Sequence, residues 1–448
     1  MPNTTPQTPN QPASPLALTP LILFLVLYVG VGTYLSLQGV EFAFYQFPAP
    51  VAILPAVFLA LLLSKESLNQ AVEQFLRGAG HQDIMAMCMI YLLAGGFAAV
   101  AKASGGVDAT VNLGLTLLPS SLILPGIFII SAFISTSMGT SVGTIAAVAP
   151  VALGIAQSTG ISLPQTAGVV LGGAMFGDNL SIISDTTIAA TRSQGCEMKD
   201  KFRENGRIAL PAALLAIVLF SFSSHAAHIP ETTPIEWLKV APYLVILVLA
   251  LLGLNVFIVL PAGIVLAGAV CLYSLNNYSV TDLSKDIYAG FGDMQEILLL
   301  SIFIGGLSAL MQKQGGLAFL TQLVSRIINM FSATHTPQAT SRSSELGIAS
   351  LVSLTNLCTA NNTIAIVVSG SVARELAEKH NISARRAASV LDIFSCVVQG
   401  MIPYGAQVLI LGATFGLSPL QVAAHSYYCL LLAGATLLTI FLKRSPRT

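Results

Sequence analysis

Charged residues are scarce in this 448-residue chain. Asp, Glu, Lys and Arg together make up 9% of it and hydrophobic residues make up 54%, whereas a soluble domain carries about 25% charged residues. This composition excludes an ordinary soluble protein and indicates a polytopic membrane protein. Basic and acidic residues are equal in number, so the formal net charge is zero, and nothing in the charge balance points to a nucleic-acid partner.

The cysteines and basic residues do not form the motifs of a disulfide-rich protein, a zinc site or a signal peptide. The six cysteines form no CxxC pair and no Cys/His spacing, which argues against a disulfide framework and a zinc site. Residues 1–17 contain no charged residue and therefore lack the basic segment of a signal peptide. We expect this segment, which is rich in Pro, Thr, Asn and Gln, to be a disordered tail.

The segment 168–195 interrupts an apolar run with two aspartates and a group of hydroxyl residues. It reads GVVLGGAMFGDNLSIISDTTIAATRSQG, so Asp178 and Asp185 fall within a stretch that could otherwise cross a membrane. A carboxylate at the bilayer centre costs ~3 kcal/mol, and the break frees backbone groups that stay at membrane depth only inside protein or beside water. Broken helices of this kind hold ions and substrates in secondary transporters.

Apolar runs divide the chain into an all-α membrane protein with about ten crossings. We predict a first transmembrane helix in 18–45, a first repeat in 46–224, an external loop with a linking transmembrane helix in 225–256, and a second repeat in 257–448. Each repeat contains an apolar run that is broken by a polar tip, at 135–144 and at 355–363. The short arms beside each tip favour a re-entrant hairpin.

The two repeats resemble each other in sequence. GGFAAVAKASGG at 95–106 matches GGLSALMQKQGG at 305–316, and TSMGTSVGTIAAV at 136–148 matches TNLCTANNTIAIV at 355–367. The two shifts, 210 and 219 positions, are close, which indicates one long duplication. The loop 192–207 carries five basic residues whereas its counterpart at 416–418 has none, and 374–386 is basic whereas 157–164 is uncharged. Because Lys and Arg mark cytoplasmic loops, we predict two inverted-topology repeats with discontinuous helices and both termini in the cytoplasm.

Polar residues concentrate at the two hairpin tips. Their hydroxyl, amide and freed carbonyl oxygens are hard neutral ligands for a cation such as Na+, and half-helix N-termini attract an anionic group. The alternative is that Ser and Thr bond to their own helix and that Asn packs between helices. The candidate tip residues are Thr136, Ser137, Thr140, Ser141 and Thr144 in the first half, and Asn356, Thr359, Asn361, Asn362 and Thr363 in the second.

Two aspartates are the candidate charged ligands of this site. A carboxylate here can neutralise a bound cation or take up a proton when the site is empty, and helix capping is compatible with either role. We therefore predict a Na+ site made by Asp178, Asp185 and Asn362. The neighbouring candidates are Asn179, Ser181, Ser184, Thr186 and Thr187.

The corresponding break in the second half contains no carboxylate. Its candidate residues are Gln399 and Tyr404, within VVQGMIPYG at 397–405. Asp392 lies about two helical turns earlier and is either a structural partner of Arg385 or Arg386 or a ligand. We expect the charge-carrying chemistry to lie in the first half.

The residues give little support to an enzyme. Gly177 and Asp178 match the end of an intramembrane aspartyl protease motif, but that motif needs glycine where Met175 stands, and no apolar run offers a partner Tyr-Asp or a Ser/His dyad. We expect no catalytic residues and no cofactor, with Na+ acting as a coupling ion. A channel is harder to exclude, although alternating broken helices suit alternating access better than a fixed pore.

The motif GAMFGDNLSIISDTTIAATRSQG resembles the NhaC family of Na+/H+ antiporters, within the wider ion transporter superfamily. The likeness covers nearly the whole chain from about residue 18 and is strongest at Gly177, Asp178, Ser184, Asp185, Thr186 and Thr187. Asn362 and Thr363 look like the Ser-Asn-Thr tips of sodium-coupled dicarboxylate transporters in that superfamily. The resemblance implies a scaffold with a moving transport domain, a bacterial inner membrane, and often a homodimer.

One departure from the family pattern concerns the transported solute. NhaC-type antiporters typically have lysine after the Gly-Asp pair and proline after the following serine, whereas this chain has Asn179 and Ile182. Branches with the Asn form resemble amino-acid permeases, and neutral amides and hydroxyls suit a zwitterion with Na+. Our hypothesis is import of a small amino acid coupled to Na+ or H+. The alternative is Na+/H+ exchange without an organic solute.

Overall fold

The computed structural model describes residues 12–40, 43–117, 119–181, 184–223, 234–332 and 337–442, and within these ranges the regular structure is helical. The elements before the linking helix are η1 (Pro15–Leu18), α1 (Thr19–Leu37), α2 (Ala43–Gln46), α3 (Ala49–Ala52), α4 (Leu54–Leu62), α5 (Leu68–Ala79), α6 (Gln82–Ala103), α7 (Gly106–Leu117), η2 (Ser120–Leu122), α8 (Ile123–Met138), α9 (Ser141–Thr159), α10 (Leu163–Leu180), α11 (Asp185–Gln194) and α12 (Met198–Ser223).

The linking helix is α13, and a second series of helices follows it. The elements are α13 (Trp237–Leu251), α14 (Val256–Ser274), α15 (Val280–Asp293), α16 (Gln295–Lys313), α17 (Gly316–Ser332), α18 (Pro337–Thr359), α19 (Asn362–Lys379), α20 (Ala384–Gln399), α21 (Ala406–Phe415), α22 (Pro419–Ala424) and α23 (Tyr427–Leu442).

Seven helical stretches in the described residues are long and apolar enough to cross a membrane, and five shorter apolar helices accompany them. This confirms an all-helical, multi-pass membrane protein, while the number of crossings stays a prediction. The broken run α10–α11 is the most enclosed of the seven, with 94% of its most apolar window buried. Asp178 therefore lies inside the protein and not against lipid, whereas Asp185 is exposed.

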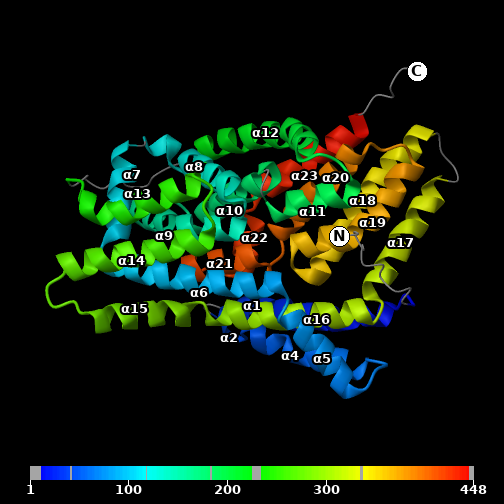
Figure 1. The fold of residues 1–448 in the computed structure, drawn as a ribbon, viewed down its shortest axis with the longest axis horizontal. Coiled ribbons are helices and arrows are strands. Elements are labelled where there is room, and N and C mark those ends of the chain that lie inside the picture. The colour runs from blue at the N-terminus through cyan, green and yellow to red at the C-terminus, as the bar shows by residue number, and fades with distance from the viewer. Residues whose placement is uncertain are drawn as a thin grey trace, which may run out of the picture.

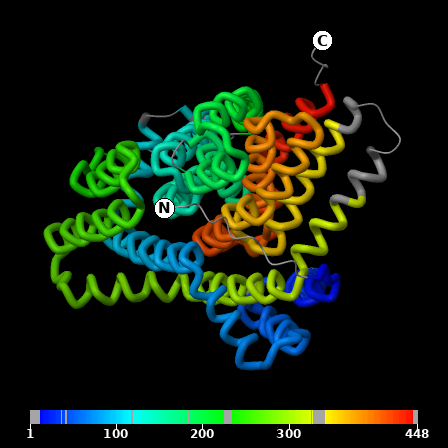
Figure 2. Tube along the Cα trace, turned by 45° about the vertical axis from the view of Figure 1, so that its right-hand side comes forward, coloured from blue at the N-terminus to red at the C-terminus, as the bar shows by residue number. Residues whose placement is uncertain are grey.

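Glycines hold two pairs of helices together along one edge of the molecule. Helices α15 and α16 lie end to end across the lower half of Figures 1 and 2. Helix α6 packs against α15, and α5, which lies below α16 in Figure 1, packs against α16. A Cβ on Gly95 would lie 2.1 Å from the carbonyl oxygen of Gly290, and a Cβ on Gly78 would lie 2.5 Å from that of Gly305. Only glycine permits such close approach of two backbones, so these contacts account for Gly95 and Gly305, the first glycine of each Gly-Gly pair.

The two hairpin tips have the same local structure when shifted by 221 positions. Gly139 and Ala360 both adopt left-handed backbone, with φ of 70° and 48°. The residues that follow, Thr140 and Asn361, each cap the next helix by accepting a hydrogen bond from the N–H three positions on. The sequence match, which used a shift of 219, is therefore wrong by two positions at the tips. It followed shared threonines, whereas the left-handed turn decides the structural register.

The contacts of the two tips repeat with the same shift. The Ser135 hydroxyl donates to the carbonyl oxygen of Ala174 at 2.6 Å, and the Asn356 amide donates to that of Ser395 at 2.7 Å. The contacts between helices are reciprocal as well, since α21 packs against α9 and α11 packs against α19. Each half thus places its broken helix against the hairpin of the other half.

Some predicted boundaries differ from the helices observed. Pro15–Leu18 forms a 3-10 turn in which Ala17 is buried, so the end of the predicted disordered tail is folded, while residues 1–11 lie outside the described part. The first long helix ends at Leu37, and not at 45, because a break precedes α2. Residues 224–233, which include most of the predicted external loop, also lie outside the described residues.

Candidate ion and solute site

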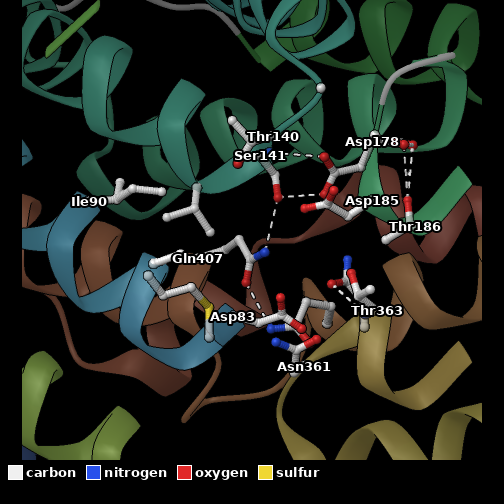
Figure 3. Close-up of a pocket in the computed structure, with 17 residues that line it drawn as sticks. Asp83, Ile90, Thr140, Ser141, Asp178, Asp185, Thr186, Asn361, Thr363 and Gln407 are labelled. Carbon is white, nitrogen blue, oxygen red and sulfur yellow. Dashed lines mark hydrogen bonds between the residues drawn. The ribbon is translucent and has the colours of Figure 1, made fainter. Parts of the chain in front are cut away.

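The broken helices and hairpin tips of both halves meet around one polar cavity. It measures about 120 Å³, which is room for several waters or a small solute, because one water needs about 10–15 Å³. Figure 3 shows side chains from both halves directed toward it. Its polar lining residues are Asp83, Thr140, Ser141, Asp178, Ser184, Asp185, Thr186, Asn361, Asn362, Thr363, Gln399 and Gln407.

Asp178 binds the N-terminus of α9. One carboxylate oxygen accepts the Ser141 backbone N–H at 2.9 Å, and the other accepts the Ser141 hydroxyl at 2.5 Å. Asp178 is 4% exposed. Since Ser141 is the first residue of α9, the carboxylate lies at the positive end of that helix. The helix end stabilises a negative charge that burial alone would disfavour.

A chain of amides extends from this contact to the second half (Figure 3). The Ser141 hydroxyl accepts from Gln407 Nε2 at 3.0 Å, and Gln407 Oε1 accepts from Gln399 Nε2 at 2.9 Å. Gln399 Nε2 also donates to the Ala360 carbonyl oxygen at 3.1 Å. Ser141 and Gln407 each donate and accept in this chain, and Gln399 donates to both Gln407 and Ala360. Side-chain hydrogen bonds therefore connect Asp178 to the second hairpin tip.

The break between α10 and α11 is held by hydroxyl groups. The Ser184 hydroxyl donates to the Asp178 carbonyl oxygen at 3.1 Å and accepts the Thr187 N–H at 3.3 Å, which caps α11. The Thr187 hydroxyl donates to the Ser181 carbonyl oxygen at 2.7 Å. These bonds satisfy carbonyls that the end of α10 leaves free. They explain why Ser and Thr follow the break in the sequence.

Two further carboxylates open onto the cavity. Asp185 is the first residue of α11 and is exposed, and the Asp83 side chain, in the first turn of α6, is 39% exposed. Together with Asp178 they give the cavity three carboxylates, and no Lys or Arg lines it within the part of the chain that the structure describes. Such a lining attracts cations.

Nine predicted site residues do not line this cavity. Thr136 and Thr144 donate to carbonyl oxygens of their own helix at 2.7 and 2.9 Å, which is the alternative considered for tip hydroxyls. Tyr404 donates to the Leu357 carbonyl oxygen at 2.5 Å. The residues away from the cavity wall are Thr136, Ser137, Thr144, Asn179, Ser181, Thr187, Asn356, Thr359 and Tyr404. The predicted Na+ ligands Asp178, Asp185 and Asn362 all line it.

The partner proposed for Asp392 is wrong. Asp392 bonds to Lys201 Nζ at 2.7 Å and to Asn205 Nδ2 at 2.8 Å, whereas Arg386 pairs with Glu345 at 2.8 Å. Lys201 belongs to the basic segment that served to orient the chain, but it is only 1% exposed. It is therefore not a loop charge, and the orientation stays a prediction that rests on the other four basic residues of that segment.

Three polar side chains at the site were not predicted. Asp83 is not within a broken apolar run, so the pattern that pointed to the other candidates did not include it. Gln407 lies in the second break but has no charge to single it out. Nothing near Lys201 in the sequence indicates that it is buried, because its partner Asp392 is far away in the chain. Within the described residues no three His, Cys, Asp or Glu side chains are grouped to hold a metal, so a cation here depends on hydroxyl, amide and carbonyl oxygens as well.

Fold and site together define a secondary transporter of the membrane, and not an enzyme. The chain is similar to the NhaC-type Na+/H+ antiporter family. The model of the Na+/H+ antiporter family matches residues 10–225. The Na(+)/H(+) antiporter NhaC of Bacillus subtilis is 24% identical over 429 residues, which are 88% of this chain and 91% of that protein.

Other relatives are named for organic solutes. The arginine/ornithine antiporter ArcD of Halobacterium salinarum is 23% identical, over 79% of this chain and 78% of that protein. The malate-2H(+)/Na(+)-lactate antiporter of Bacillus subtilis is 28% identical, over 44% of this chain and 42% of that protein. Among solved structures, the YdaH transporter of Alcanivorax borkumensis is similar with a TM-score of 0.42 and 14% identity, covering 94% of this chain and 98% of that one.

Proposed function

We propose that the protein imports a small amino acid together with Na+ by alternating access. The observation that carries this proposal is a difference between two corresponding helix N-termini at the cavity. The N-terminus of α9 already holds a carboxylate, that of Asp178. The N-terminus of α19, which corresponds to it by the shift of 221 positions, has Gln399 at the place of that carboxylate.

The end of α19 is therefore suited to the carboxylate of a solute. Gln399 donates to the Ala360 carbonyl oxygen and does not reach the α19 N–H groups as an anion would. Asn361 and Asn362 cap the helix with their own side-chain oxygens, at 3.0 Å in both cases. A helix N-terminus without an acidic partner favours an anionic group. The amides of these two residues can turn to the solute when it binds.

The opposite wall of the cavity is suited to the positive groups. Asp178 and Asp185 would face the ammonium group of the solute and the coupling Na+, with hydroxyl and carbonyl oxygens at Thr140 and Ser184 completing the cation's shell. A cavity of about 120 Å³ suits a small amino acid more than a large one. The ArcD relative, which is named for two amino acids, also supports this choice.

Reciprocal packing supports two inverted-topology repeats, as alternating access requires. The pairs α6 with α15 and α5 with α16, and α9 with α21 and α11 with α19, are what a pseudo-twofold axis produces. Under this proposal the axis lies in the membrane plane, both termini are cytoplasmic, and the second hairpin exchanges roles with the first during transport.

Na+/H+ exchange without an organic solute is the second candidate, and the NhaC relatives favour it. Thermal unfolding of the purified protein in detergent separates the two. We expect one small amino acid to raise the unfolding midpoint in NaCl but not in choline chloride, because binding to the native state stabilises it. A midpoint that responds to Na+ and pH but to no amino acid would instead favour exchange.

A further inference from the structure

A buried ion pair lies behind the break between α10 and α11 and joins the two halves. Lys201 is on α12 and Asp392 is on α20, and their side chains are 1% and 0% exposed. Their charged atoms are 2.7 Å apart. Burying two charges is costly unless the oxygens and protons around them are satisfied, so the surroundings of this pair bear on its purpose.

The Lys201 ammonium is surrounded by the oxygens that a monovalent cation would choose. Besides Asp392, its Nζ contacts the Asn179 carbonyl oxygen at 2.8 Å and the Thr187 hydroxyl at 2.6 Å. Carbonyl, hydroxyl and carboxylate oxygens are hard ligands. The Asn179 carbonyl oxygen is available as a ligand because α10 ends at Leu180, one residue later.

Further oxygens in this group of residues lack partners. Oδ1 of Asn179, Oδ1 of Asn205 and Oδ1 of Asp392 are buried without a hydrogen bond among the described residues. Unsatisfied buried acceptors are rare in proteins and need an explanation. A set of acceptors with too few donors is what a cation site presents.

We propose that the Lys201 ammonium is a built-in cation, which fills a second cation site made by Asn179, Thr187 and Asp392. The ammonium balances Asp392, and of the two buried aspartates among the described residues only Asp178 then requires an exchangeable cation. This deepens the proposed function and rests on it for the role of Asp178. It assigns to Lys201 a positioning and charge-balancing role that sets how many Na+ ions each cycle carries.

Removal of the ammonium should open the second site to Na+. Met has the length to fill the space of Lys201 without its charge, and the isolated Asp392 carboxylate would then recruit a cation from solution, because an unpaired buried charge is strongly unfavourable. The expected result for Lys201→Met is one more bound Na+ per protein than in the wild type.

The test is direct binding of radioactive Na+ to purified protein in detergent, with choline as the replacing cation. Asp178→Asn should bind one Na+ fewer than the wild type, and Lys201→Met/Asp178→Asn should regain that one. The neutral pair Lys201→Met/Asp392→Asn is the matched control and should gain none over the wild type. A folded Lys201→Met/Asp178→Asn protein that binds no more Na+ than Asp178→Asn would overturn the proposal.

Folding of the variant is itself a readout. If Lys201→Met elutes as a folded protein only when purified in NaCl, Na+ has replaced the ammonium and the proposal is supported. Failure to fold in both salts, while the neutral pair folds, would contradict it. A wild type that binds no Na+, beside a double variant that binds one, would reject the proposed coupling at Asp178 and leave the role of Lys201 standing.

Discussion

Asp178 and Gln399 occupy corresponding positions in the two halves of the molecule, but only Asp178 bonds to the first residue of the hairpin helix beside it. Asp178 accepts two hydrogen bonds from Ser141, whereas Gln399 donates to Gln407 and to the Ala360 carbonyl oxygen. Two similar halves therefore make a site with one acidic and one neutral wall.

Replacement of Asp178 by Asn should abolish Na+-dependent transport, with a loss of at least about 100-fold, because a charged hydrogen-bond acceptor and the only enclosed carboxylate of the cavity wall are removed. The amide can still accept from Ser141, so we expect the fold to be retained. Flux in proteoliposomes at equal protein content measures the effect.

Asp185→Asn should also abolish cation-dependent transport, since the exposed Asp185 carboxylate lines the cavity. Glu73→Gln is the matched control for both changes, because Glu73 is on the outer face of α5 with a side chain that is 61% exposed. Undiminished flux in both aspartate variants would refute the assignment of the site.

Asp83→Asn should weaken Na+ attraction without abolishing transport. Asp83 is partly exposed at the cavity wall, so its charge acts mainly through the local field. We expect the Na+ concentration for half-maximal flux to rise about three- to tenfold at low ionic strength and the difference to shrink in high salt. Equal shifts at low and high ionic strength would argue against this electrostatic role, and Glu378→Gln on the exposed end of α19 serves as control.

Swapping alanine and glycine at the left-handed residues of the two tips should change the free energy of unfolding in opposite directions. Ala360 has φ of 48°, where a Cβ costs about 1–2 kcal/mol, so Ala360→Gly should raise the free energy of unfolding by about 0.5–1 kcal/mol after the entropy of glycine is counted. Gly139→Ala should lower it by about 1 kcal/mol. Denaturation in detergent measures both, and a change of the same sign in the two variants would contradict the shared tip geometry.

The glycine contact between α6 and α15 gives a test of the helix packing. Gly95→Ala places a methyl group against the backbone of Gly290 and should lower the free energy of unfolding by about 1–3 kcal/mol. Gly292→Ala, on α15 two positions from that contact, has open space around it and should be neutral or slightly stabilising. Equal effects at the two positions would show that the helices do not approach as described.

The helix breaks and the hairpin tips could be predicted from the sequence, because polar residues within an apolar run stand out from their neighbours. Asp178, Asn361 and Asn362 were found in this way, and all line the cavity. The register between the halves was missed by two positions, since it depends on the left-handed turns at Gly139 and Ala360, where the two sequences differ. One tip has glycine and the other has alanine at the left-handed position, so the residue type alone does not reveal the shared backbone conformation.

Contacts between residues that are far apart in the chain could not be predicted from the sequence. The burial of Lys201 follows from its contact with Asp392, which belongs to the other half, and a lysine between other basic residues is typical of a solvated loop. Asp83 was not predicted, because it lies outside the broken apolar runs. Its place at the cavity follows from the packing of α6 against the first hairpin.

The most direct test of the central claim uses the wild-type protein in vesicles that hold a pH-sensitive dye. A Na+ gradient is imposed, labelled amino acids are added one at a time, and internal pH and uptake are followed together. Na+-coupled import predicts uptake of one small amino acid that requires Na+, with no Na+-driven change of internal pH before it is added. A Na+-dependent pH change in the absence of any amino acid, with no uptake, would contradict the proposal and identify a Na+/H+ exchanger.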